Sequence, residues 1–139
     1  MREAGVVAAM KSPNLVPIFD MEFEIQRCYM VMELADTDLY SHIRKTRGLP
    51  PDETKDIMWD ILMGLRTMHE HKYLHRDIKP DNILLKEGKA MISDFGLSRN
   101  VLFGSQRLTP IVGSLSYRPI EILLGTDKYN GAVDIWSVG

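Results

Sequence analysis

Two polar motifs flank a segment whose pattern predicts a β-hairpin, and this arrangement constrains the fold more than any other feature. The first motif is His75-Arg76-Asp77-Ile78-Lys79-Pro80-Asp81-Asn82, and the second is Asp94-Phe95-Gly96. Between them lie two apolar runs, 83–85 and 90–92, joined by the turn-forming residues Lys86-Glu87-Gly88-Lys89. A chain that reverses at this turn brings Asp77 and Asn82 back beside Asp94.

The rest of the pattern predicts an α+β chain. Apolar runs at 15–19 and 28–33 predict an antiparallel hairpin, with 20–27 as the connection. Helices are predicted over 1–10, 39–45 and 52–71, and from Gly131 onward; either Asp36 or Asp38 is expected to cap the second. The helix over 52–71 shows the strongest period, with its apolar face formed by Ile57, Ile61, Leu65 and Met68. Residues 97–118 show no clear period.

Composition excludes several classes of function. The chain has 139 residues and a formal net charge of −2, which argues against a nucleic-acid surface. The single cysteine, Cys28, rules out an intrachain disulfide and suggests an intracellular protein. No apolar window is long enough to span a membrane. His69 and His71 lie two apart on a predicted helix, hence on different faces, which argues against a shared zinc ion.

Together the two motifs resemble the catalytic loop and the metal-binding turn of a protein kinase. Phosphoryl transfer needs an oriented hydroxyl, held phosphates and metal ions on the phosphate oxygens. The resemblance implies that Asp77 accepts or orients the hydroxyl proton and that Lys79 contacts the transferring phosphate of ATP. Asn82 and Asp94 supply hard oxygen ligands, which suit Mg²⁺. Gly96 allows a sharp backbone turn after the metal ligand.

The resemblance covers essentially the whole chain and lies with the cyclin-dependent and mitogen-activated group of Ser/Thr kinases. The run Tyr117-Arg118-Pro119-Ile120-Glu121-Ile122-Leu123-Leu124-Gly125 is similar to that group's Tyr-Arg-Ala-Pro-Glu-(Val/Ile)-Leu-Leu-Gly. The run Val133-Asp134-Ile135-Trp136-Ser137-Val138-Gly139 is similar to the start of the central C-lobe helix, αF, in which Asp134 would brace the catalytic loop. Pro119-Ile120 and Ser116 depart from the group's pattern, which bears on substrate-loop packing rather than on the phosphoryl chemistry.

The resemblance also implies the residues around the nucleotide. Glu3 would lie on helix αC as the partner of the ATP-binding lysine. Glu33 and Ala35 would present hinge backbone groups to adenine, and Asp38 would reach the ribose. The gatekeeper and regulatory-spine positions would be Met32, Val7, Ile18, His75 and Phe95. Core packing explains the apolar members of this set equally well, because most apolar residues are simply buried.

The activation segment supplies the subfamily evidence. Asp94 and Glu121 are 27 positions apart, as in cyclin-dependent kinases, and no Thr-X-Tyr pair of the mitogen-activated type is present. Thr109 falls at the activating phosphothreonine, whose charge of about −1.5 to −2 would be held by the arginines Arg2, Arg76 and Arg99. An alternative is that Thr109 is merely an exposed loop residue.

Two positions near the end of this segment bear on the substrate. Ser114 would take the place of the threonine that bridges Asp77 and Lys79. Gly113 and Arg118 occupy positions that create a preference for proline after the phospho-acceptor, and glycine tolerates the positive φ needed there.

The sequence is thus expected to form part of a kinase fold: an N-lobe remnant over 1–33, holding the end of αC and two strands, and a partial C-lobe over 34–139. It contains no Gly-rich phosphate loop and no strand lysine. The expectation is an ATP- and Mg²⁺-dependent Ser/Thr kinase acting on Ser/Thr-Pro proteins with a cyclin-like activator. The isolated chain should be a truncated, poorly soluble piece with little activity. A non-catalytic half-kinase that binds a partner is the alternative.

Overall fold

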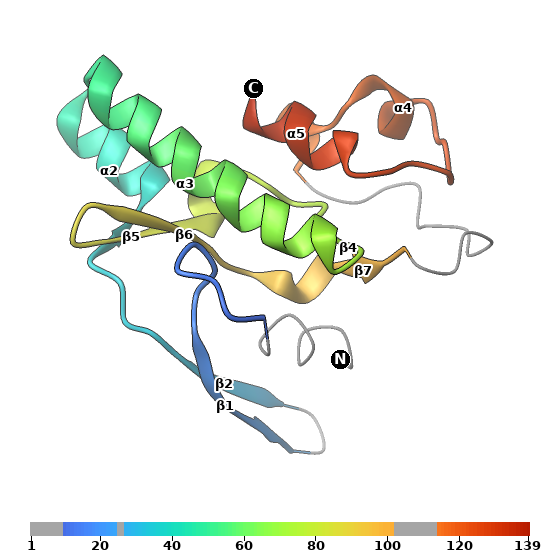
Figure 1. Ribbon diagram of the computed structural model, residues 1–139, viewed down its shortest axis with the longest axis horizontal. Helices are drawn as coiled ribbons and strands as arrows, with labels where there is room; N and C mark the ends of the chain where they lie inside the picture. Colours follow the sequence, from blue (N-terminus) through green and yellow to red (C-terminus); the bar gives the residue numbers. More distant parts are fainter. Residues whose placement is uncertain (1–9, 25–26, 102–113) are drawn as a thin grey trace.

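The computed structural model describes residues 10–24, 27–101 and 114–139 (Figure 1). The helix predicted over 1–10 therefore falls almost entirely outside the described residues. The strands are β1 (Ile18–Phe23), β2 (Cys28–Met32), β3 (Thr37–Asp38), β4 (Tyr73–Leu74), β5 (Ile83–Lys86), β6 (Lys89–Ile92) and β7 (Arg99–Asn100). The helices are α2 (Leu39–Thr46), α3 (Pro51–Glu70), α4 (Ile120–Leu123) and α5 (Ala132–Val138), with 3₁₀ turns at Pro80–Asn82, Phe95–Leu97 and Leu115–Tyr117.

The hairpin between the two polar motifs is present as predicted. Strands β5 and β6 pair antiparallel, from Ile83 opposite Ile92 to Lys86 opposite Lys89. The two-residue turn, Glu87-Gly88, has positive φ at both positions (50° and 75°), as the tightest hairpin turns require. Strand β3 pairs with the outer edge of β5 to complete a three-stranded sheet.

The first hairpin also forms, but the predicted bounds of its first strand are wrong. Strand β1 begins at Ile18 and runs through the polar stretch to Phe23, pairing antiparallel with β2. Leu15 and Val16 are instead buried, and the Val16 amide donates to the Ile92 carbonyl of β6 at 2.9 Å. The run at 15–19 is apolar because its first residues enter the core beside β6. Its length and apolar character predicted a strand but could not indicate this partner.

Helix α3 carries the core, as its periodicity predicts. Its residues Ile57, Ile61, Leu65 and Met68 are all buried in the main apolar cluster. The helix lies along the β5–β6 hairpin (Figure 1). The cap of α2 is Asp38, whose carboxylate accepts from the Ser41 amide at 2.8 Å. The short helix α4 was not predicted, because four residues cannot display a helical period.

Gly64 is required by a close backbone approach within α3. A Cβ at this position would lie 2.7 Å from the Asn14 carbonyl oxygen and 2.8 Å from Ile92 Cδ1. We expect Gly64→Ala to destabilise the fold by about 1–3 kcal/mol, although alanine is the better helix former by about 1 kcal/mol. Urea unfolding of the purified chain measures this, with the exposed Lys55→Ala on the same helix as control. A stabilised Gly64→Ala protein would contradict the packing.

Exposed apolar side chains gather on the C-terminal elements. Leu115, Ile120, Leu124 and Trp136 are between 56% and 78% exposed. Exposed apolar surface of this kind favours association, which is the physical basis for expecting a poorly soluble chain. Within the described ranges, none of the helices is long and apolar enough to cross a membrane.

Candidate active site

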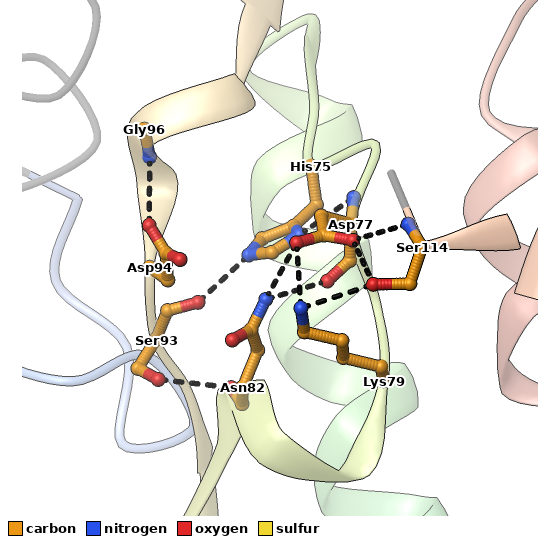
Figure 2. Close-up of polar contacts among 8 residues, drawn as sticks. All are labelled: His75, Asp77, Lys79, Asn82, Ser93, Asp94, Gly96 and Ser114. Atoms are coloured by element: carbon orange, nitrogen blue, oxygen red, sulfur yellow. Dashed lines mark hydrogen bonds and ion pairs between the residues drawn. The ribbon is translucent and has the colours of Figure 1, made fainter. Parts of the chain in front are cut away.

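The Asp77 carboxylate is the centre of a four-residue polar cluster (Figure 2). Its Oδ1 atom accepts from the backbone amide of Ser114 at 2.8 Å and from the Ser114 hydroxyl at 3.2 Å. Its Oδ2 atom lies 3.3 Å from Lys79 Nζ and accepts from Asn82 Nδ2 at 3.1 Å. Lys79 Nζ also donates to the Ser114 hydroxyl at 3.0 Å. The four residues predicted to be catalytic therefore lie together, although Ser114 is 37 positions from Asp77.

The charge of Asp77 follows from these contacts. Burial raises the pKa of its carboxyl, but the Ser114 amide, the Lys79 ammonium and the Ser114 hydroxyl together outweigh burial and hold the pKa below its ordinary value. Asp77 is therefore ionised at neutral pH. An ionised carboxylate beside an ammonium can accept a proton from, or orient, a substrate hydroxyl.

Asp134 holds the backbone that presents Asp77. Its fully buried carboxylate accepts from the His75 amide at 2.9 Å and from the Arg76 amide at 2.8 Å. His69 Nε2, at the end of α3, contacts the same carboxylate at 2.8 Å. The φ of Arg76 is 71°, a value rare for residues other than glycine. The two amide contacts therefore fix an unusual turn immediately before Asp77.

Asn82 and Asp94 are brought to the same region by the β5–β6 hairpin. The Asn82 amide nitrogen donates to the Asp77 carbonyl at 2.8 Å, and its amide oxygen faces the side on which Asp94 lies (Figure 2). Asp94 is exposed, has φ 58°, and accepts from the Gly96 amide at 3.3 Å. An amide oxygen and a carboxylate form the small oxygen-donor set that Mg²⁺ shares with substrate phosphates and water.

Ser93 joins these two residues and was missed by the sequence interpretation. Its backbone amide and its hydroxyl both donate to the Asn82 carbonyl, at 2.9 and 3.0 Å. The residue directly before Asp94 is thereby fixed to Asn82. Ser93 is a small polar residue at a strand end and belongs to neither of the two polar motifs, so no sequence signal marked it.

His75 bridges the catalytic loop and the segment before Asp94. The Asp77 amide donates to His75 Nδ1 at 3.2 Å, and Nε2 contacts the Ser93 carbonyl at 2.9 Å. Only the neutral ring that carries its proton on Nε2 satisfies both contacts. The ring also packs edge-on against Phe95, with centroids 5.8 Å apart, as expected for two neighbouring spine positions.

Acid should therefore destabilise this bridge. Burial lowers the pKa of the His75 imidazole from 6.5, and the Asp134 charge only partly offsets this effect. Below about pH 6.5 the unfolded chain binds a proton that the folded chain does not, so stability falls as pH falls, by up to about 1.4 kcal/mol per pH unit from this group. NMR should show His75 neutral in the folded chain at pH 6, where the ring in urea is mostly protonated. A folded-state ring that titrates above pH 6.5 would contradict the bridge.

The segment between β2 and β3 leaves backbone groups available to a ligand. The Glu33 amide donates to the Pro17 carbonyl at 3.0 Å, and the Asp36 amide donates to the Leu85 carbonyl at 2.9 Å. Among the described residues, no partner is found for the Glu33 carbonyl or for either backbone group of Ala35. These are the groups predicted to meet adenine. Both carboxylate oxygens of Asp38, predicted to reach the ribose, already accept from Ser41, at 2.8 and 2.7 Å.

The predicted phosphate-binding cluster is only partly described. Arg2, Glu3 and Thr109 lie outside the described residues, as do Val7 and Gly113. Arg76 is buried, and its Nε and Nη1 atoms donate to the Leu97 carbonyl at 2.7 Å and to the Tyr129 hydroxyl at 2.9 Å. Arg99 donates to the Ser98 carbonyl at 3.1 Å.

The histidines do not form a metal site in the part of the chain that the structure describes. His69 contacts Asp134, and His71 Nδ1 contacts the Thr67 carbonyl at 2.8 Å. Across residues 10–24, 27–101 and 114–139, no group of three or more His, Cys, Asp or Glu residues could hold a metal ion. Asn82 and Asp94 provide only two protein ligands, so a magnesium ion bound there would rely on phosphate oxygens to complete its coordination.

Comparison with known proteins identifies the class to which this fold and cluster belong. The family described as "Protein kinase domain" matches residues 1–139, so the chain belongs to the protein kinase domain family. Within that family it is similar to cyclin-dependent kinases. It is 39% identical to cyclin-dependent kinase 2 of Caenorhabditis elegans and 35% identical to cyclin-dependent kinase-like 4 of Mus musculus, over 100% of its own length.

The chain spans about two fifths of these curated relatives, 39% of the first and 41% of the second. The chain is also similar to a solved structure, the yeast RNA Pol II CTD kinase CTDK-1 complex, with a TM-score of 0.88 and 35% sequence identity. The match covers 99% of this chain and 46% of the chain in that complex. The predicted partial kinase fold of α+β type is therefore confirmed. The chain has the fold of part of a kinase domain.

Proposed function

We propose that this chain carries the hydroxyl-orienting and metal-holding half of a Ser/Thr kinase site that uses Mg²⁺ and ATP. The observation that carries the proposal is the cluster around Asp77, with Lys79, Ser114 and Asn82 within 3.3 Å of its carboxylate oxygens. Phosphoryl transfer needs a carboxylate, an ammonium and metal-holding oxygens from this side of the site, and the Asp77–Lys79 pair with Asn82 and Asp94 supplies them. An intracellular location follows from the proposal, because both cofactors are abundant inside cells.

Each residue has a defined part in this proposal. Asp77 accepts or orients the proton of the substrate hydroxyl, and Ser114 keeps its carboxylate in place. Lys79 neutralises charge on the transferred phosphoryl group. Asn82 and Asp94 hold Mg²⁺, which when bound neutralises charge on the phosphate oxygens. The free backbone groups of the 33–36 segment bind adenine, and Glu3 pairs with the lysine that binds ATP.

The substrate and the regulation follow from the resemblance to cyclin-dependent kinases. We infer a preference for Ser/Thr-Pro sites through Gly113 and Arg118, and activation by phosphorylation of Thr109 held by Arg2, Arg76 and Arg99. The buried Arg76 guanidinium supports an anion site, because its described partners, the Leu97 carbonyl and the Tyr129 hydroxyl, are neutral. A cyclin-like activator is the inferred partner.

We further propose that residues 1–33 belong to the N-lobe and residues 34–139 to the C-lobe. The first sheet, β1–β2, is separate from the second, β3–β5–β6, and the 33–36 segment connects β2 to β3. The run before β1 also contacts the second sheet, through the Val16 amide and the Ile92 carbonyl. The 139-residue polypeptide by itself should have little activity. Its sequence has no Gly-rich loop and no strand lysine, and positioning of the phosphates supplies most of the catalysis.

A peptide phosphorylation assay tests this proposal. The protein expressed from its complete open reading frame should transfer phosphate from Mg-ATP to a Ser-Pro peptide and much less to the matched Ser-Ala peptide. Equal rates on both peptides would remove proline direction but keep the kinase. No transfer to any peptide, together with stable capture of a specific protein partner, would favour the non-catalytic half-kinase instead.

A further inference from the structure

The segment between β2 and β3 is attached by its side chains to the turn of the β5–β6 hairpin. The Lys86 ammonium forms an ion pair with the Glu33 carboxylate. The Asp36 carboxylate accepts from the Glu87 amide at 2.8 Å, and the Asp36 amide donates to the Leu85 carbonyl at 2.9 Å. Two side-chain contacts and one backbone hydrogen bond to the end of β5 and its turn thus hold a segment of four residues.

These contacts do not involve the Glu33 carbonyl or the backbone groups of Ala35. Glu33 and Asp36 use their side chains on the hairpin, whereas the Glu33 carbonyl and both backbone groups of Ala35 have no partner among the described residues. Leu34, between them, is 85% exposed and contributes little packing to hold the segment. The conformation of the open backbone groups therefore depends on the contacts at either end, which the side chains of Glu33 and Asp36 make together with their backbone amides.

The same hairpin carries the metal-holding residues at its other end. Asn82 directly precedes β5, and Ser93 and Asp94 directly follow β6, while Lys86 and Glu87 lie at the turn (Figure 1). Each strand has four residues and so spans roughly 13 Å. Because β3 pairs with β5 and α3 packs against β6, this antiparallel ladder is a supported, short connector between the two ends.

We propose that Lys86, acting through Glu33, is a positioning residue that fixes the adenine-binding segment at a set distance from Asn82 and Asp94. The inference rests on the proposed function for the identity of the ligand, but not for the attachment itself. Lys86 does not contact the nucleotide. It acts by keeping the 33–36 segment on the hairpin turn, together with the Asp36 contact to the Glu87 amide.

The strength of this attachment can be anticipated. Both side chains of the pair are partly exposed, at 36% for Lys86 and 29% for Glu33, and a pair of this kind changes an equilibrium by a factor of about 2–5. The Glu33 carboxylate raises the pKa of the Lys86 ammonium, so Lys86 carries its positive charge at every pH at which the protein would be assayed. High salt should weaken the attachment, because the pair is accessible to solvent.

Hydrogen exchange on the 139-residue chain tests the attachment without any ligand. In Lys86→Met, the Glu33 and Asp36 amides should exchange about 2–5-fold faster, with the Ile92 amide of β6 unchanged as internal reference. Lys86→Arg should restore slow exchange, and so should the charge-swapped pair Glu33→Lys with Lys86→Glu. Lys89→Met removes an exposed lysine from the same turn and should change nothing.

Binding of adenosine and of Mg-ADP to the same variants separates the two proposals. If the wild-type chain binds both, Lys86→Met should weaken both about 2–5-fold, whereas Asp94→Asn should weaken only Mg-ADP. Unchanged exchange in Lys86→Met, or a loss that Lys86→Arg does not restore, would overturn the positioning role. Normal exchange effects with no nucleotide binding by the wild type would keep the attachment and count against the proposed function of this chain.

Discussion

Replacing Asp134 with alanine is expected to destabilise the folded chain by about 3–5 kcal/mol and to release the catalytic loop. The substitution leaves the buried amides of His75 and Arg76 without acceptors, and each such group costs about 1–3 kcal/mol. It also removes the partner of His69. Stability should be measured by urea unfolding, and loop order by hydrogen exchange at these two amides.

Asp134→Asn is the matched control, because it keeps the size of the side chain and one acceptor oxygen. It should cost less, about 1–3 kcal/mol, since only one of the two loop amides faces the new NH₂ group. His69→Gln should cost less again, because its ring is partly exposed and the loop amides keep their acceptors. An Asp134→Ala protein that is as stable as the wild type, with both amides still protected, would show that another group holds the loop.

The sequence predicted the local elements of the site well and their long-range supports poorly. The hairpin was predictable because apolar runs and a Gly-containing turn are local signals, and it alone places Asn82 near Asp94. Ser114 was predicted by resemblance only, because the contact that joins it to Asp77 spans 37 positions. Ser93 was not found at all, because its role depends on the position of its hydroxyl in space.

Long-range contacts also account for the wrong bounds predicted for the first strand. The run at 15–19 was predicted to be a strand, but Leu15 and Val16 pack against β6 and the strand begins at Ile18. Periodicity reports which residues are buried, and it does not report which partner buries them. Gly64 shows the same limit. Its unfavourable helix propensity in α3 can be read from the sequence, whereas the close approach of the Asn14 carbonyl oxygen, which requires a glycine, cannot.

The largest effect on activity is expected from Asp77→Asn in the protein expressed from its complete open reading frame. Asparagine cannot take up a proton, and its NH₂ group would face a site now occupied by donors from Lys79 and Asn82. We expect kcat to fall by about 10²–10⁴-fold, the usual contribution of a general base, with little change in KM for ATP. Phosphate transfer to a Ser-Pro peptide under saturating Mg-ATP measures this.

Asp81→Asn supplies the control, because Asp81 lies in the same loop, is exposed and makes no described side-chain contact. It should leave kcat within about twofold, so that a difference between the two variants reports the position of the carboxylate and not the charge of the loop. The pKa of Asp77 lies below its ordinary value of 3.8, so this group should cause no loss of rate on acidification until the pH falls below about 4. An equal fall in kcat in both variants would argue that Asp77 acts only through the electrostatic field of its negative charge. The proton of the substrate hydroxyl would then leave by another route.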